Sequence, residues 1–116
     1  MWCLPVSADV YFPARSACPR HELFPGVVTT TCWGERLMLS LVELAPGAVV
    51  EEHHHPHEQA GLVLEGQARF IIGGVERILG PGDRFVIPSN VPHKVIVLDQ
   101  PCRVLDAFSP PREEYK

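Results

Sequence analysis

The chain has 116 residues, with 14 acidic and 10 basic side chains, a net charge of −4 and a mean hydropathy of +0.05. A chain of this length is expected to form one domain that buries about two-thirds of its surface on folding. No basic stripe indicates a nucleic-acid partner, no apolar run approaches the length of a membrane span, and the N-terminus has no leader pattern, so we expect a cytoplasmic protein.

Residues 1–25 contain four prolines and no clean hydrophobic period, which predicts an arm packed against the rest of the protein or against a neighbour. Residues 26–116 are expected to form a single β-barrel domain. The prolines and glycines leave little room for long helices. Between them lie eight short segments rich in β-branched residues, which we predict to be strands: Val27–Trp33, Arg36–Leu44, Leu62–Glu65, Ala68–Ile72, Val75–Leu79, Arg84–Ile87, Lys94–Leu98 and Arg103–Phe108.

Turn signals separate these segments. Gly73-Gly74 stands between two of them and predicts a two-residue hairpin, because glycine tolerates the positive φ that such turns require. Eight short strands with closely spaced turns predict an all-β fold, a jelly-roll-like sandwich or barrel. The segment Arg36–Leu44 has apolar residues on both faces, so one face would cover the interior and a partner subunit could cover the other.

Two glycine-containing frames hold the most informative residues. The first frame reads Gly47-x5-His53-x-His55-x3-Gln59-x6-Gly66, and the second reads Gly82-x5-Pro88-x4-His93. Residues two apart on a strand point to the same face, so His53 and His55 can hold one ion together. Gln59 keeps the same parity if the strand continues without a bulge. His93, from a distant strand, would complete a set of three imidazoles and one amide oxygen, which predicts a metal site with open positions.

The remaining histidines and the cysteines are given other roles. We expect His54 to point away from the ion, His57 to line the mouth of the site, and His21, which stands outside both frames, to lie on the surface. The four cysteines form no C-x-x-C pair, which predicts neither a disulfide framework nor a zinc knot. They are interpreted as buried or incidental thiols: Cys3, Cys18, Cys32 and Cys102.

The ligand set leaves open which divalent transition metal binds, among Ni, Zn, Mn, Fe and Cu. Imidazole suits several of these ions, whereas the amide oxygen of Gln59 is a hard neutral donor. Four neutral ligands leave the full charge on the dication, where a glutamate at this position would reduce it by one. A neutral ligand set makes the ion a stronger Lewis acid toward a carboxylate or keto-enol substrate. Iron sites that activate dioxygen commonly include a carboxylate ligand, so Gln59 also favours a non-oxidative reaction over an oxygenase.

The two frames resemble the two characteristic motifs of the cupin superfamily, over residues 36–112. The resemblance implies a double-stranded β-helix barrel and, because cupins commonly dimerise through their sheets, a homodimer. In the family the first motif supplies two histidines and a glutamate, and the second supplies a further histidine. This chain departs from that pattern, since Gln59 occupies the glutamate position, Asn90 a frequent glycine position and Val97 a frequent asparagine position.

The combination HPHEQ-x4-LEG, IGG, PGD, IP-x3-PH and D-x-FSPPRE is similar to a branch of small single-domain cupins that includes the pectin- and alginate-degradation cupins acting on unsaturated uronates. The likeness implies that His53, His55, Gln59 and His93 hold the metal and that Asp106, Phe108 and Arg112 are catalytic. The reaction of this branch converts a 4,5-unsaturated monosaccharide uronate into its linear keto form. From the residues alone, Phe108 could equally be core, Asp106 a satisfied polar group and Arg112 a surface partner of Glu113 or Glu114.

Three classes of function fit this sequence. The first is a metal-dependent, non-oxidative isomerase or lyase that acts on a small sugar acid or keto-acid, and Gln59 and Asp106 favour it. The second is a metal-dependent dioxygenase or oxidase. The third is a barrel that binds a small ligand without turnover. Metal content, oxygen uptake and turnover on an unsaturated uronate distinguish the three.

Overall fold

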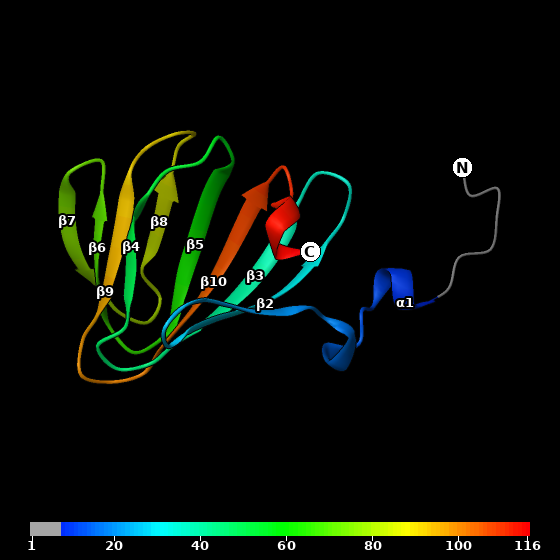
Figure 1. Ribbon diagram of the computed structural model, residues 1–116, viewed down its shortest axis with the longest axis horizontal. Helices are drawn as coiled ribbons and strands as arrows, with labels where there is room; N and C mark the ends of the chain where they lie inside the picture. Colours follow the sequence, from blue (N-terminus) through cyan, green and yellow to red (C-terminus); the bar gives the residue numbers. More distant parts are fainter. Residues whose placement is uncertain (1–7) are drawn as a thin grey trace.

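The computed structural model describes residues 8–116, so Cys3 and the first part of the predicted arm lie outside the described residues. Most of the regular elements in the described chain are short strands (Figure 1). In chain order its elements are α1 (Ala8–Tyr11), η1 (Arg15–Ala17), β1 (Arg20–Phe24), β2 (Val27–Trp33), β3 (Met38–Leu44), β4 (Val49–His53), β5 (Glu58–Glu65), β6 (Ala68–Ile72), β7 (Val75–Leu79), β8 (Arg84–Ile87), β9 (His93–Val97), β10 (Cys102–Ser109) and η2 (Glu113–Tyr115).

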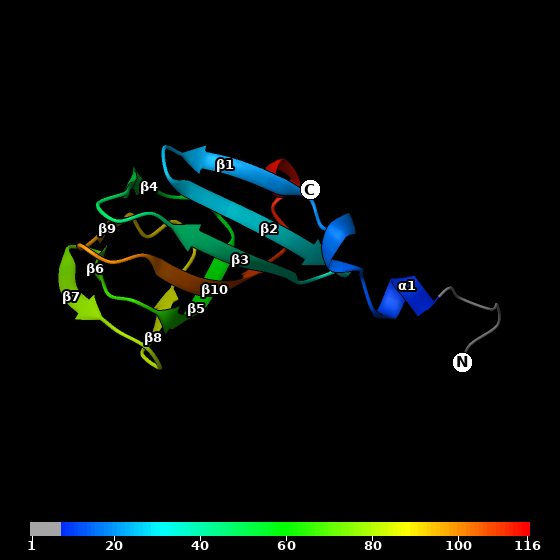
Figure 2. The same cartoon turned by 90° about the horizontal axis from the view of Figure 1, so that it is seen from below.

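The strands form two antiparallel sheets that pack face to face, as two views at right angles show (Figures 1 and 2). The larger sheet has the strand order β1-β2-β3-β10-β5-β8, and the smaller has the order β4-β9-β6-β7. The predicted all-β, jelly-roll-like sandwich is therefore confirmed. Within residues 8–116, no helix combines the length and the apolar character that crossing a membrane requires.

Four predicted strands, now β2, β6, β7 and β8, have the bounds that the turn signals indicate. Two further strands, β1 and β4, are missing from the prediction. β1 lies within the predicted arm and pairs with β2, with Arg20 opposite Thr30. β4 is short and carries Glu51 and Glu52 directly before His53, so its sequence has little apolar alternation. Ahead of β1, the segment with α1 and η1 extends away from the sandwich (Figure 1).

The inner face of the larger sheet is apolar at one end and polar toward the other. β10 alternates between buried and half-buried positions along its whole length, so every second side chain enters the sandwich. Its register with β3 places Val104 opposite Val42 and Asp106 opposite Ser40. The apolar end packs into one buried cluster that includes Val27, Val42, Leu44, Val63, Phe70, Phe85 and Val104. Each such side chain contributes roughly 1.5–3 kcal/mol on burial, so this end holds the sheets together.

The chain between His53 and Gln59 does not continue as one strand, and here the parity argument is wrong. β4 ends at His53 and β5 begins at Glu58, with a turn between them that contains Pro56. His53 consequently belongs to the smaller sheet and Gln59 to the larger one. The turn, rather than the pleat of a strand, brings these side chains to one place.

The predicted hairpin at Gly73-Gly74 is present between β6 and β7. Both glycines have positive φ, 56° and 80°. These values fit a primed two-residue turn, whose twist matches that of the flanking strands. The hairpin sets the register of β6 with β7, and β6 in turn pairs with β9 so that Ile72 lies opposite His93.

Candidate functional site

Three histidines meet at one end of the sandwich. His53 is the last residue of β4, His93 is the first residue of β9, and the two are paired across these strands. His55 lies in the turn that follows β4. One nitrogen of each ring lies within 4.8 Å of the others, an arrangement that could hold a metal ion. His55 and His93 are buried, whereas His53 is half-buried, so the group is largely shielded from solvent but is partly exposed at His53.

Each of the three rings is held by the backbone through Nδ1. The Nδ1 atoms of His53, His55 and His93 lie 2.8, 3.0 and 2.9 Å from the carbonyl oxygens of Glu51, His57 and Val91 respectively. A carbonyl oxygen only accepts hydrogen bonds, so Nδ1 carries the proton and is the donor in each of these three hydrogen bonds. The neutral ring then has its lone pair on Nε2, which is the tautomer and orientation that backbone acceptors impose on metal-binding histidines.

Burial favours the neutral form of two of these imidazoles. Desolvation lowers the pKa of His93 to about 4, and it also lowers the pKa of His55, with the Arg112 guanidinium adding to the effect. The Nε2 atom of His93 is buried and has no hydrogen-bond partner. An orphaned lone pair in a buried position costs free energy unless a cation or a donor meets it. The histidine group therefore fits a metal ion.

Gln59 lies beside the histidines on β5 and is itself buried. Its amide donates a hydrogen bond to Asp106, which leaves its carbonyl oxygen directed at the histidines. That oxygen, Oε1, lies 3.1 Å from Nε2 of His55. With the proton on Nδ1, both of these atoms are acceptors, so a cation between them would relieve an unfavourable contact. The position of Gln59 is thus compatible with the predicted fourth ligand.

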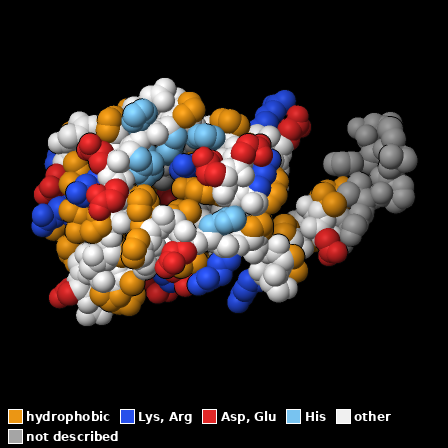
Figure 3. Space-filling view, in the orientation of Figure 1, with side chains coloured by type: hydrophobic (Ala, Val, Ile, Leu, Met, Phe, Trp, Pro, Cys, Tyr) orange, Lys and Arg blue, Asp and Glu red, His pale blue; other side chains and the backbone are white. Residues whose placement is uncertain are grey.

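The histidines form part of the wall of a pocket with a cavity volume of about 60 Å³. Because one water needs roughly 10–15 Å³ on this measure, the cavity has room for several waters or for an ion and a small ligand group. Figure 3 shows the histidines gathered around a hollow in this face of the molecule. The pocket is lined by all the predicted site residues except His55, which packs against its wall through Phe108.

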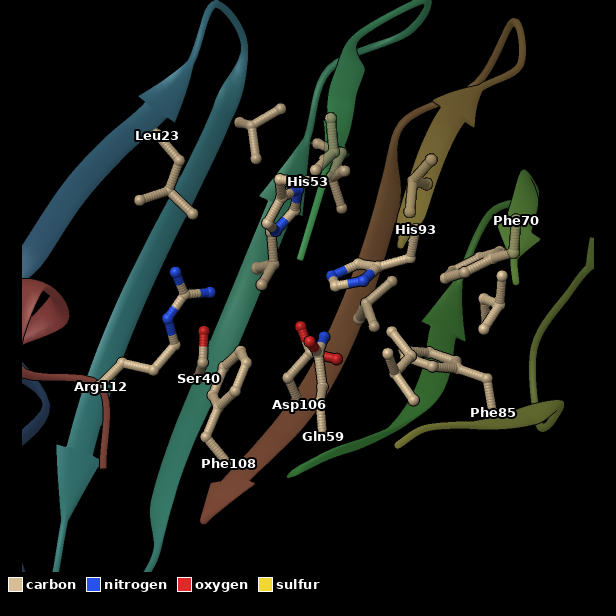
Figure 4. A pocket seen from close by; sticks show the side chains of 18 of the residues that line it. Leu23, Ser40, His53, Gln59, Phe70, Phe85, His93, Asp106, Phe108 and Arg112 are labelled. Carbon is tan, nitrogen blue, oxygen red and sulfur yellow. The ribbon is translucent and has the colours of Figure 1, made fainter. Parts of the chain in front are cut away.

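Asp106 is a buried carboxyl in the wall of the pocket. Its side chain is on β10 and points between the sheets, beside Gln59 and facing His93 (Figure 4). Burial raises the pKa of Asp106 to about 7, against the hydrogen bond from Gln59 and the charge of Arg112, which both lower it. Oδ1 has no hydrogen-bond partner. A carboxyl that lines the pocket and has a pKa near neutrality is suited to exchange a proton with a molecule there.

Arg112 is buried in the pocket wall rather than displayed on the surface. Its Cζ lies 4.2 Å from the ring centroid of Tyr115 and 5.3 Å from that of Phe108. Nε lies 3.4 Å from Oε1 of Glu114, which is the ion pair that the alternative interpretation of Arg112 named. Arg112 thus pairs with Glu114, as the alternative interpretation expected, and it also lines the pocket, as the family resemblance implied.

Three further residues that the sequence singled out lie close to the histidine group. His54 is exposed, in agreement with the expectation that it points away from the ion. His57 packs its ring edge-on against that of His55 at 5.5 Å and holds His55 through its backbone carbonyl. Phe108 is fully buried and contacts His55 with ring centroids 5.8 Å apart, so it is a core residue that also forms pocket wall.

Residues 40–108, more than half of the chain, match the family described as Cupin domain. The chain belongs to the cupin family. This cupin is 34% identical over 99 residues to the pectin degradation protein KdgF of Dickeya dadantii, covering 84% of this chain and 90% of the relative. It is 35% identical over 72 residues to the dimethylsulfoniopropionate lyase DddQ of Ruegeria pomeroyi, of which it covers 36%.

Among solved structures, this cupin is similar to KdgF from a Halomonas species. The TM-score is 0.81 and the identity 30%, and the match covers 89% of this chain and 96% of that one. Both the sequence and the fold of this cupin are therefore similar to KdgF proteins over nearly their full length. The predicted membership of the cupin superfamily, with its likeness to the pectin-degradation branch, is confirmed.

Sequence reasoning missed two residues of this cupin's site. Tyr115 packs on Arg112 and lines the pocket, although it stands next to the end of the printed sequence among charged residues. Ser40 lines the same pocket from β3. The signal for Ser40 was present, since it is a polar residue at a position whose neighbours two residues away, Met38 and Val42, face the core.

Proposed function

We propose that this cupin is a metal-dependent, non-oxidative enzyme that converts a 4,5-unsaturated monosaccharide uronate into its linear keto form. The observation that carries the proposal is the buried Asp106 carboxyl in a pocket that has the His93 imidazole on one wall and the Arg112 guanidinium on another. A sugar acid needs these groups together, namely a cationic site for its carboxylate and a group that moves protons. The likeness to a pectin degradation protein supports the same substrate class.

The metal would be held by Nε2 of His53, His55 and His93 and by Oε1 of Gln59. Burial favours the neutral form of the two deeper imidazoles, and the amide of Gln59 carries no charge. A divalent transition metal bound by neutral ligands keeps its full charge and acts as a Lewis acid toward carboxylate and hydroxyl oxygens. Its identity among Ni, Zn, Mn, Fe and Cu is left to measurement.

The side chains of the pocket supply binding and proton transfer. Arg112 binds the substrate carboxylate, and its guanidinium is suited to this because it offers parallel donors that match the two carboxylate oxygens. Phe108 packs against the sugar ring. The Asp106 carboxylate takes the proton of the anomeric hydroxyl while the bond between C1 and the ring oxygen breaks, which leaves an aldehyde at C1 and an enolate at C5.

Asp106 completes the isomerisation by returning a proton. The enolate at C5 becomes a ketone when C4 gains a proton, and Asp106 holds the proton that it took from the anomeric oxygen. No atom is gained or lost, so neither an oxidant nor a second substrate is needed. A carboxyl whose pKa is about 7 both accepts and donates a proton readily at neutral pH.

We also propose that this cupin is a cytoplasmic homodimer that pairs through the outer face of its larger sheet. Apolar side chains are exposed on three strands of that face, with Leu39 at 48%, Leu64 at 37% and Val86 at 61% exposure. An exposed apolar face of this kind is typical of an interface between subunits. Sedimentation of purified protein gives the mass of the assembly and tests this.

The test of the enzyme proposal begins with metal content, measured by elemental mass spectrometry on untagged protein purified without chelator or nickel resin. The same preparation is then given a 4,5-unsaturated uronate, and loss of the ultraviolet absorbance of the double bond is followed against a protein-free control. Asp106→Asn is the matched variant, because it keeps the shape and hydrogen bonding of the side chain while removing its proton transfer. Stoichiometric metal in both proteins, with turnover only in the wild type, is expected.

Two results would overturn the proposal. Metal without turnover on any unsaturated uronate would remove this substrate class and direct attention to oxygen uptake and to ligand binding. Turnover that survives in Asp106→Asn would show that Asp106 has a structural role only.

A further inference from the structure

Cys18 and Cys32 are cross-strand neighbours, a relationship that lies outside the pocket and outside the proposed reaction. In the pairing of β1 with β2, Arg20 is opposite Thr30 and His21 is opposite Thr29. Extending this antiparallel register by two residues places Cys18 opposite Cys32. The register does extend in that direction, because the amide of Thr31 donates a 3.1 Å hydrogen bond to the carbonyl of Pro19.

The backbone geometry at this position suits a covalent link. Cys18 has extended dihedral angles, φ −72° and ψ 125°, so the chain is already strand-like before β1 begins. The Thr31–Pro19 hydrogen bond makes that pair the hydrogen-bonded one, which leaves Cys18 and Cys32 as a non-hydrogen-bonded pair. In such pairs the Cα atoms lie about 4.5 Å apart, within the range of roughly 4.4–6.8 Å that disulfides span.

The two thiols also share an environment that solvent can reach. Both are half-buried and free, and both line a groove of about 270 Å³ between β2 and the segment that carries α1. The charge of Cys18 contributes, after burial, to raising the pKa of the Cys32 thiol, which shows that the two groups are close enough to interact. Cys102, by contrast, is buried in the core and faces neither of them.

We propose that Cys18 and Cys32 form a reversible disulfide that ties the segment before β1 to β2. The oxidant is a low-molecular-weight disulfide such as oxidised glutathione. One cysteine thiolate attacks a glutathione sulfur, forming a mixed disulfide and releasing one glutathione thiolate. The other cysteine then attacks the protein sulfur of the mixed disulfide and releases the second glutathione. The protein loses two protons and two electrons, and the glutathione disulfide gains them as two thiols.

The link would act on an edge strand, since within the described residues β1 is hydrogen-bonded to a neighbouring strand, β2, on one side alone. It closes a loop from residue 18 to residue 32 that contains β1 and its turn into β2, at the edge of the larger sheet. Cross-linking such a loop reduces the freedom of the unfolded chain, so the oxidised protein should be more resistant to heat. Next to Cys32, the hydroxyl of Thr31 donates a 2.7 Å hydrogen bond to the carbonyl of Tyr115, so the link lies beside the C-terminal turn that covers the pocket.

The experiment equilibrates the full chain in glutathione buffers of graded redox potential, blocks free thiols, and digests with trypsin. Cleavage after Arg15, Arg20 and Arg36 puts Cys18 in peptide 16–20 and Cys32 in peptide 21–36, while Cys102 falls in peptide 95–103. We expect peptides 16–20 and 21–36 to be joined in oxidising buffer and separated by dithiothreitol. Cys102→Ser should retain the link, and Cys18→Ser and Cys32→Ser should each lose it.

Thermal unfolding provides the second readout. The oxidised wild type should melt at a higher temperature than the reduced wild type, and Cys32→Ser should show no dependence on the glutathione ratio. The proposal fails if peptides 16–20 and 21–36 stay separate at every ratio, or if Cys32 pairs with any other cysteine or with a second copy of the chain. A link that leaves the melting temperature unchanged would overturn its role in tying the segment to β2.

Discussion

Gly61 on β5 lies directly opposite Asp106 on β10, and the Asp106 carboxylate occupies part of the space that a side chain at Gly61 would need. A Cβ at this position would lie 2.6 Å from Oδ1 of Asp106 and 2.1 Å from Cζ of Phe85. Both distances are shorter than real contacts allow. Glycine is therefore required here for space, because the Asp106 carboxyl group and the Phe85 ring occupy the volume that a side chain would fill.

Gly61→Ala should consequently disturb the site from a position that never touches the substrate. Forcing a methyl group into a packed region costs typically about 1–3 kcal/mol of stability, and we expect a loss of this size in the free energy of unfolding. Displacing Asp106 by a fraction of an ångström to an ångström should reduce turnover by up to about 100-fold. Denaturant unfolding and turnover measure the two effects.

Gly34→Ala is the matched control, since a Cβ at Gly34 meets no atom within 4 Å. It should leave both the unfolding free energy and the turnover close to those of the wild type. Equal behaviour of the two variants would show that Phe85 and Asp106 move aside without consequence.

The strands with clear turn signals could be predicted from the sequence, and the edge strand β1 could not. β6, β7 and β8 are bounded by glycine and proline residues, whose backbone requirements are local. β1 has the sequence RHELF, in which charged and apolar residues do not separate cleanly, and it is a strand because β2 supplies its hydrogen bonds. Pairing with a neighbour is a tertiary effect that a single segment does not reveal.

The histidine group could be predicted because its spacing is unusual, although the argument from strand parity was wrong. His53 and His55 converge because a turn follows β4, not because one strand continues through both. Tyr115 and Gly61 could not be predicted. Tyr115 matters because it packs on Arg112, and Gly61 because it pairs with Asp106 on the neighbouring strand, and these contacts depend on the path of η2 and on the register of β10.

His93→Ala should lose most of the bound metal. His93 supplies an Nε2 that is buried and has no other partner, so nothing in the pocket replaces it as a ligand. His54→Ala is the control, because His54 is exposed and lies one residue from two members of the histidine group. Elemental mass spectrometry measures the metal bound per chain in both variants. Full occupancy in His93→Ala would show that this histidine is not a ligand.

Gln59→Glu should retain metal but change which metal is preferred and how it reacts. A carboxylate in place of the amide lowers the net charge of the site by one and introduces a negative charge beside Asp106, to which the Gln59 amide now donates. The added charge favours the proton on Asp106 and weakens the Lewis acidity of the ion. Metal competition and turnover with each ion would show this, whereas unaltered preference and turnover would contradict it.

Tyr115→Ala should weaken substrate binding more than it slows the chemical step. The ring of Tyr115 lies 4.2 Å from Cζ of Arg112 and holds the guanidinium against the pocket wall. Loss of a partly desolvated cation–π contact costs about 1–2 kcal/mol, so we expect KM to rise about tenfold with a smaller change in kcat. Tyr115→Phe keeps the ring but removes the hydroxyl that hydrogen-bonds with Arg112, so its KM should lie between those of the wild type and Tyr115→Ala. A fall in kcat at constant KM would instead place Tyr115 in the chemistry.

The buried carboxyl of Asp106 should make the stability of the metal-free protein depend on pH in a defined direction. Its pKa is about 7 in the folded protein and 3.8 in the reference state, so between these values the folded chain holds a proton that the unfolded chain has released. Stability from this group therefore falls as the pH rises from about 4 to about 7, by at most about 1.4 kcal/mol per pH unit, and levels off above that.

Comparison with Asp106→Asn isolates this effect. His93, whose pKa is lowered to about 4, contributes with the opposite sign over the same range, but it does so in both proteins and cancels in the difference. The unfolding free energy of Asp106→Asn minus that of the wild type should rise from about pH 4 to pH 7 in chelator-treated samples. Chelation matters because a bound dication would lower the pKa of the carboxyl. A difference that stays flat over this range would mean that Asp106 is ionised at the same pH in the folded and unfolded chains.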